Sequence, residues 1–147
     1  MLQRVSGASV SIDGSTVAAI GQGLLILLGI EETDGQADID YLVRKISQMR
    51  IFSDADGKMN LSLLEIEGEA IVVSQFTLFA STKKGNRPGF TRSAAPPISK
   101  PLYEAFLKSL SATLPKPVGH GEFGADMQVS LTNSGPVTII IDSKEKA

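Results

Sequence analysis

The chain has 147 residues and a formal net charge of −2, with 42% hydrophobic and 20% charged residues. This is the composition of one ordinary globular domain, predicted to span residues 1–147, and it excludes a disordered or fibrous protein. The chain has no cysteine, so disulfides, thiolate nucleophiles and cysteine-bound metals are excluded and a cytoplasmic location is expected. The sequence has no signal-peptide pattern and no apolar run long enough to cross a bilayer, so no membrane partner is expected.

The N-terminal part of the chain reads as three strands. Two β-rich stretches, residues 8–12 and 16–20, flank Asp13-Gly14, and Asp-Gly is a favourable hairpin turn. Residues 24–30 then form a continuous apolar run of strand length. Such a run predicts a strand covered on both faces, which is therefore central in its sheet.

The middle of the chain predicts a helix and two further strands. Apolar side chains recur at helical spacing over residues 37–49, with Thr33 or Asp34 available upstream as a cap. Residues 50–52 read as a short strand and residues 70–74 as a buried one. A loop with little order is expected from about residue 81 to residue 99.

A second helix and three β-like pieces complete the chain. The helix is predicted over residues 100–114, because its apolar residues share a face and Pro115 and Pro117 end it. The β-like pieces are residues 118–122, 127–131 and 137–141. This order of elements predicts an α/β fold: a single domain of packed mixed β-sheets, barrel-like, with the two helices on the outside.

Net charge limits the kind of nucleic acid that the protein could bind. A protein that grips a long duplex by its phosphates is normally strongly basic, so an RNA or DNA partner of this chain must be held locally. Lys83, Lys84, Arg87 and Arg92 fall within ten residues that contain no acid. That segment is either a phosphate contact or a solvated loop face.

The usual catalytic signatures are missing. His120 is the only histidine, so a Ser-His-Asp triad cannot be assembled from the sequence alone. No phosphate-binding glycine loop and no histidine-rich metal site is present. Two segments nevertheless carry unusual polar chemistry: Ser74-Gln75-Phe76-Thr77-Leu78 and Asn133-Ser134-Gly135-Pro136-Val137-Thr138. By themselves they read as a polar strand end and a strand-entry turn.

In register with their surroundings, these two segments resemble the D-aminoacyl-tRNA deacylase (D-tyrosyl-tRNA deacylase) family, whose paired signatures are Ser-Gln-Phe-Thr-Leu and Asn-x-Gly-Pro-Val-Thr. The resemblance covers nearly the whole chain, which makes it far more specific than either short motif. The other stretches that agree include Gln3-Arg4-Val5, Arg50-Ile51-Phe52, Arg87-Pro88, Ala94-Ala95-Pro96 and the run from Phe123 to Val129.

The resemblance implies a homodimeric hydrolase that cuts the ester between a D-amino acid and the 3′ acceptor end of tRNA, with no cofactor or metal. It implies that Gly135-Pro136 has a cis peptide bond and enters the partner subunit's site, where its carbonyls reject L side chains. Glycyl-tRNA would then also be a substrate. The residues assigned to the reaction are Ser74, Gln75, Phe76 and Thr77. Those assigned to the substrate pocket are Gly135, Pro136, Asn133, Met127 and Ala94, and those assigned to tRNA are Lys83, Lys84 and Arg87.

Two mechanisms and two other functions remain open at this stage. Backbone N–H groups and hydroxyls of residues 74–77 could stabilise the oxyanion, while the ribose 2′-OH of the substrate activates water or assists without a protein base. Alternatively, Thr77 is a covalent nucleophile, although no base is recognisable beside it. Phe76 or Phe79 could stack on the terminal adenine or simply pack in the core. A non-catalytic RNA-end binding module and a small-molecule ester hydrolase are the competing functions.

Overall fold

A strongly curled mixed sheet forms the frame of the protein in the computed structural model. The model describes residues 1–146, so Ala147, the last residue of the predicted domain, lies outside the described residues. Strand β1 is central: β8 pairs along one edge of it, while β2 and β3 pair with the two halves of the other edge. The strands of this sheet are β1 (Leu2–Ile12), β2 (Ser15–Ile20), β3 (Gly23–Leu28), β6 (Glu69–Ser74), β7 (Gly119–His120) and β8 (Gln128–Ile139).

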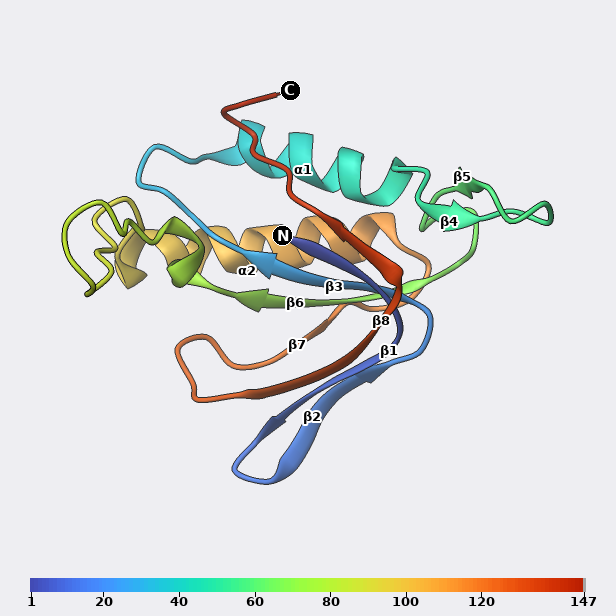
Figure 1. Ribbon diagram of the computed structural model, residues 1–147, viewed down its shortest axis with the longest axis horizontal. Helices are drawn as coiled ribbons and strands as arrows, with labels where there is room; N and C mark the ends of the chain where they lie inside the picture. The colour runs from blue at the N-terminus through green and yellow to red at the C-terminus, as the bar shows by residue number, and fades with distance from the viewer. Residues whose placement is uncertain (147) are drawn as a thin grey trace.

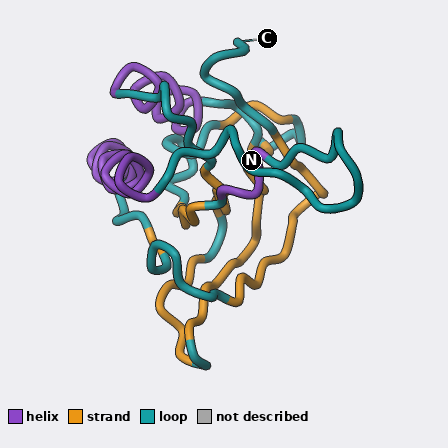
Figure 2. The backbone as a smooth tube through the Cα atoms, turned by 90° about the vertical axis from the view of Figure 1, so that its left-hand side faces the viewer, coloured by secondary structure: helices purple, strands orange, loops and turns teal. Residues whose placement is uncertain are grey.

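Both helices cover the same face of this sheet (Figures 1 and 2). They are α1 (Gln36–Gln48) and α2 (Pro96–Thr113), and they also pack against each other. On the opposite face the sheet curls until β2 lies near β6 and β7. This is the predicted barrel-like α/β arrangement with two outer helices, built mainly from one sheet, with a small ribbon of β4 (Phe52–Ser53) and β5 (Met59–Leu61) beside it.

The predicted hairpin and buried strands are confirmed. Ile12 pairs with Ser15 across Asp13-Gly14. Strands β3 and β6 run parallel, with Leu28 opposite Ser74 at their ends. Alternate residues of β3 face the helix-side core and the inside of the curl, and both faces are covered. This burial explains the continuous apolar run, because neither face of the strand meets water.

Three predicted boundaries were wrong. Helix α1 is capped by Gly35, whose N–H donates to Asp38 Oδ2 at 2.9 Å, rather than by Thr33 or Asp34. Helix α2 begins at Pro96, not residue 100, because proline suits a first helical turn, where N–H groups have no intrahelical partner. The short strand predicted at residues 50–52 is β4, which spans Phe52–Ser53. Within the predicted loop, a pair of backbone hydrogen bonds joins Ser81 and Gly89.

Strand β8 corrects the prediction of two separate pieces after residue 126. It runs without a break from Gln128 to Ile139. Its pairing with β1 shifts register on both sides of Val5, and the larger shift lies toward the N-terminus of β1. There Val5 pairs with Asn133 but Gln3 pairs with Thr138, so four residues of β8 face Arg4 alone. A bulge of this kind lets a segment protrude while pairing continues on either side, which is why the sequence there resembles a turn.

No helix among residues 1–146 is long and apolar enough to span a membrane.

A buried tyrosine supports the end of β6. Strand β7 pairs with β6 only at Ile71 and Val72, and the Val72 carbonyl accepts a hydrogen bond from the Tyr103 hydroxyl of α2 at 2.9 Å. Tyr103 is 4% exposed, and its burial raises the pKa of the phenol from 10.0 to about 12. The helix layer is therefore joined to the strand two residues before it leaves the sheet.

We expect Tyr103→Phe to lower the free energy of unfolding by about 1–2 kcal/mol, because the Val72 carbonyl loses a buried partner. The raised pKa means that this stabilisation is complete below pH 10 and is lost as pH rises through about 12. The difference in the free energy of unfolding between wild type and variant, measured by urea unfolding, should therefore shrink as pH rises from 10 to about 12. The matched control is Tyr41→Phe on α1, and an equal pH dependence there would contradict the assignment.

Candidate active site

The first predicted motif forms a tight turn where β6 leaves the sheet, here called the strand-end turn (residues 74–79). Gln75 N–H donates to the Leu28 carbonyl at 2.8 Å, extending the β3 pairing by one residue. The chain then enters a short 3-10 helix, η1 (Phe76–Phe79). The turn therefore lies at the carboxyl end of two buried parallel strands, which is where α/β sheets place ligand sites.

A cavity of about 490 Å³ opens beside the strand-end turn. Strands β3 and β6, the start of α2 and the segment before β8 all contribute walls. Five of the predicted site residues line it together: Ser74, Gln75, Phe76, Ala94 and Met127. The other lining residues are Leu28, Ile30, Val73, Ser93, Pro96, Ser99, Phe123, Gly124, Ala125 and Val129.

Thr77 is not among the lining residues, but it lies next to them. Its side chain is exposed, and its Oγ1 accepts a hydrogen bond from Gln75 Nε2. The threonine is therefore at the rim of the cavity, held by the neighbouring amide.

The cavity wall carries no ionisable side chain among the described residues. His120 is exposed on β7, where its Nδ1 lies 2.6 Å from the Gly121 carbonyl, and it takes no part in the lining. Within residues 1–146 no group of three or more acidic or histidine side chains could hold a metal ion. The described part of the chain therefore brings no general base into this cavity.

The polar groups that the strand-end turn offers are mainly backbone N–H donors. The first i to i+3 hydrogen bond of η1 runs from Leu78 N–H to the Gln75 carbonyl at 3.4 Å. The N–H groups of Phe76 and Thr77 precede it, so the turn itself gives them no partner. Backbone donors without a partner of their own are the kind of group that can bind an oxygen carrying negative charge.

The second predicted motif lies elsewhere in the chain. Gly135 and Pro136 are exposed in the β8 bulge, their peptide bond is cis as the resemblance implies, and Gly135 has φ +127. Arg4 holds the bulge: its Nε donates to the Ser134 carbonyl at 3.0 Å and its Nη1 to the Ile51 carbonyl at 2.7 Å. Neither Gly135 nor Pro136 lines the cavity.

Asn133 stays with this second motif rather than with the cavity. Its Oδ1 accepts a hydrogen bond from Val137 N–H at 2.9 Å, and its Nδ2 donates to Gln3 Oε1. One chain therefore unites five predicted site residues at the cavity and leaves Gly135, Pro136 and Asn133 apart from them. The sequence analysis did not single out Arg4, although a charged residue at a half-buried strand position was a usable signal.

The basic segment divides into two parts. Lys83, Lys84 and Arg87 are exposed on the loop of residues 81–89, here called the basic loop, and form no ion pair with any of residues 1–146. Arg92, in the same acid-free run, does form one: its Nη2 lies 2.6 Å from Glu31 Oε1. Only the first three cations are fully available to a partner.

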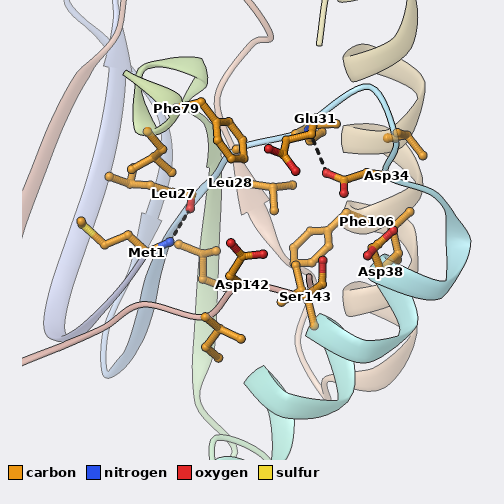
Figure 3. A pocket seen from close by; sticks show the side chains of 18 of the residues that line it. Met1, Leu27, Leu28, Glu31, Asp34, Asp38, Phe79, Phe106, Asp142 and Ser143 are labelled. Atoms are coloured by element: carbon orange, nitrogen blue, oxygen red, sulfur yellow. Dashed lines mark hydrogen bonds between the residues drawn. The ribbon is translucent and has the colours of Figure 1, made fainter. Parts of the chain in front are cut away.

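A second cavity of about 290 Å³ lies on the helix side of the same wall (Figure 3). Leu28 and Ile30 line both cavities. In Figure 3 the Phe79 ring projects into the second one beside Leu28 and Glu31. Its acidic rim is internally paired, since Lys144 bridges Asp34 and Asp38.

Comparisons with known proteins identify the family of this chain. A family model described as D-Tyr-tRNA(Tyr) deacylase matches residues 1–142. A protein of Bacteroides thetaiotaomicron named D-aminoacyl-tRNA deacylase is 60% identical over 146 residues, covering 99% of this chain and 97% of the relative.

Two solved structures share the fold. One, described as c-Myc DNA Unwinding Element Binding Protein, has a TM-score of 0.88 and 41% identity, covering 94% of this chain and 93% of the other. The second, described as "Structural Analysis of a probable eukaryotic D-amino acid tRNA deacylase", has a TM-score of 0.77 and 17% identity, with coverages of 90% and 92%. At that identity the second supports the fold alone. By its sequence over nearly its full length, this chain belongs to the D-Tyr-tRNA(Tyr) deacylase family.

Proposed function

We propose that this protein is a D-aminoacyl-tRNA deacylase, which hydrolyses the ester between a D-amino acid and the 3′-terminal ribose of tRNA. Family membership supports the reaction class. The observation that carries the mechanism is the cavity at the strand-end turn, which is lined by Ser74, Gln75 and Phe76 and by no ionisable side chain. Such a site offers shape and fixed dipoles, and its chemistry needs a reactive group on the substrate.

The substrate supplies that group in this proposal. The terminal ribose keeps a free 2′-OH beside the ester, at the very high effective concentration of an intramolecular group. This hydroxyl activates the water that attacks the ester carbonyl. The N–H groups of Phe76 and Thr77 bind the oxyanion, where each donor contributes on the order of 3–4 kcal/mol.

Gly135-Pro136 of a second subunit completes the pocket. In one chain this motif is exposed and does not line the cavity, so we assign it to the cavity of another copy. Strand β8 favours such an assembly, because its outer edge has no strand partner within residues 1–146. The exposed Leu131 lies in this strand, and the exposed Ile140 follows its last residue. An unpaired edge of this length normally needs a cover.

The motif acts as a filter made of main chain. Its carbonyls occupy the direction that an L side chain would take from Cα, so L-aminoacyl esters are rejected sterically. Glycine at position 135 brings backbone against the ligand with no Cβ in the way. Glycyl esters present no side chain to reject and are substrates as well.

The RNA end is held by an aromatic ring and a few charges. Phe76 is 56% exposed at the mouth of the cavity, which suits stacking on the terminal adenine. Phe79 is the weaker candidate, because the Arg92 guanidinium covers its ring. Lys83, Lys84 and Arg87 contact acceptor-stem phosphates, which requires few charges and is compatible with a net charge of −2.

The chiral filter predicts a graded response at β8. With D-tyrosyl-tRNA and L-tyrosyl-tRNA as paired substrates, wild type should release only the D-amino acid. A Cβ at Gly135 would lie 2.8 Å from Arg4 Nη2 on a backbone with φ +127, so Gly135→Ala should cut D-specific turnover at least about tenfold. The neighbouring control Ser134→Ala should stay near wild type.

Equal, near-normal rates for the two variants would remove the filter from Gly135. RNA binding with no turnover by wild type would favour an RNA-end binding module. Rates on free D-tyrosine esters equal to those on D-tyrosyl-tRNA would favour a small-molecule ester hydrolase.

Cross-subunit assembly predicts complementation between two defective variants. Gly135→Ala spoils the motif, and Phe76→Ala spoils the strand-end turn. After the two variants are denatured together and refolded, half of the dimers are hybrids, and each hybrid has one site with neither defect. About a quarter of wild-type activity should return if the site is shared between symmetric subunits. Activity no higher than the mean of the two single variants, or a fully active monomer in sedimentation, would contradict a site shared between subunits.

The role of Thr77 separates the two mechanisms. If the 2′-OH activates water, Thr77→Ala should lose only about tenfold to thirtyfold, because one orienting hydrogen bond is removed. A D-aminoacyl-tRNA ending in 2′-deoxyadenosine should then bind and hardly react. Single-turnover rates with both substrates provide the measurement. Fast cleavage of the deoxy substrate together with an inactive Thr77→Ala variant would make Thr77 the nucleophile.

A further inference from the structure

The basic loop returns to the body of the protein directly across the strand-end turn. The five residues that follow it, 90–94, are here called the return segment, and they contact both ends of η1. Resting on the proposed function, we infer that Arg92 is a positioning residue for the strand-end turn and not a contact for tRNA phosphate. The charges of the acid-free run therefore have two different tasks.

Arg92 is engaged on two sides. Its Nε and Nη2 lie 2.9 and 2.6 Å from Glu31 Oε1. Its guanidinium carbon lies 5.0 Å from the centroid of the Phe79 ring. The Glu31 side chain is only 18% exposed, so the pair is anchored on the wall that follows β3. A planar guanidinium can form both contacts at once, since it stacks through its face and donates from its edge.

The Phe79 ring is half-buried and borders a cavity, so the Arg92 guanidinium adds to its packing. One side of the ring lies on the backbone at Gly29, where an added Cβ would come within 2.8 Å of Phe79 Cε2. The ring also borders the second cavity, which leaves it without dense contacts in that direction (Figure 3). The Arg92 guanidinium thus supplies the contact that keeps the ring against Gly29.

The return segment holds the other end of the turn as well. Ser93 Oγ donates to the Phe76 carbonyl at 2.7 Å, and Phe90 meets the Phe76 ring edge-on at 5.2 Å between centroids. The N–H groups of Phe76 and Thr77 are proposed to bind the oxyanion. The Thr77 N–H belongs to the same peptide unit as the Phe76 carbonyl, and the Phe76 N–H belongs to the peptide unit before it. The direction of the two N–H groups depends on both units, and donor direction governs the stabilisation of a transition state.

Kinetics separate positioning from phosphate binding. Arg92→Gln should lower kcat about tenfold, the cost of one charge-assisted hydrogen bond. The loss should be equal on D-tyrosyl-tRNA and on D-tyrosyl-adenosine, with an unchanged KM and salt dependence for the tRNA. The neighbouring Arg87→Gln variant should instead raise KM for the tRNA and flatten its salt dependence. Arg44→Gln, an exposed arginine of α1 far from both tasks, is the control for loss of charge.

Glu31 provides an internal check. Glu31→Gln should reproduce the kcat loss of Arg92→Gln, and the double variant should lose no more than either single one. The melting temperature of each should stay within about 2–4 °C of wild type, because exposed ion pairs contribute little to global stability. A larger fall in melting temperature that tracks the lost rate would reduce Arg92 to a structural role and overturn the inference.

Hydrogen exchange tests the inference without activity. Arg92→Gln should accelerate exchange of the amides between Gln75 and Ala80 and leave those of β6 unchanged, whereas Arg44→Gln should change neither. A rise in KM and a flatter salt dependence with normal exchange would make Arg92 a phosphate contact, and no change in any measurement would also overturn the inference. If wild type fails to cleave D-tyrosyl-tRNA, the proposed function falls while the exchange result still decides the role of Arg92.

Discussion

The parallel pairing of β3 and β6 is the constraint on which the rest of the structure depends. Both strands are buried on both faces, and their register brings Leu28 opposite Ser74. Gln75 N–H continues the pairing one residue beyond the strand. Deleting side chains from such cores typically costs about 2–5 kcal/mol, so the sheet is a stiff support. The pairing of these two strands therefore sets the position of the strand-end turn.

An uncharged cavity on a stiff support divides the chemistry between protein and substrate. A buried ionised base would be expensive to keep in the apolar wall formed by residues such as Ile30, Phe123 and Met127. Backbone N–H groups cost less, because the fold orients them already. In the proposed reaction the protein contributes orientation and dipoles, and the ribose contributes the hydroxyl that a side chain supplies in other hydrolases.

An arginine side chain contacts each of the two motifs, Arg4 at the β8 bulge and Arg92 at the strand-end turn. Arg4 fixes the bulge by donating to two carbonyls, so that Gly135-Pro136 is presented outward from its own subunit. Arg92 contacts the strand-end turn through the Phe79 ring while it pairs with Glu31. In both cases the arginine joins segments that are distant in sequence, Arg4 reaching Ser134 and Arg92 reaching Glu31. The proposed dimer brings the two presented surfaces together in one site.

The sequence by itself determined the element types that have strong periodicity and the identity of the two motifs. The hairpin at Asp13-Gly14 and the buried run of β3 follow from local turn chemistry and hydrophobic pattern, which need no knowledge of distant contacts. The tertiary structure alone decided where the motifs lie. The bulge that separates Gly135-Pro136 from Ser74 and Met127 depends on a register slip opposite Arg4, and the engagement of Arg92 depends on Glu31, a residue 61 positions away. Pairing register and long-range ion pairs are set by the packed fold, so no local pattern could reveal them.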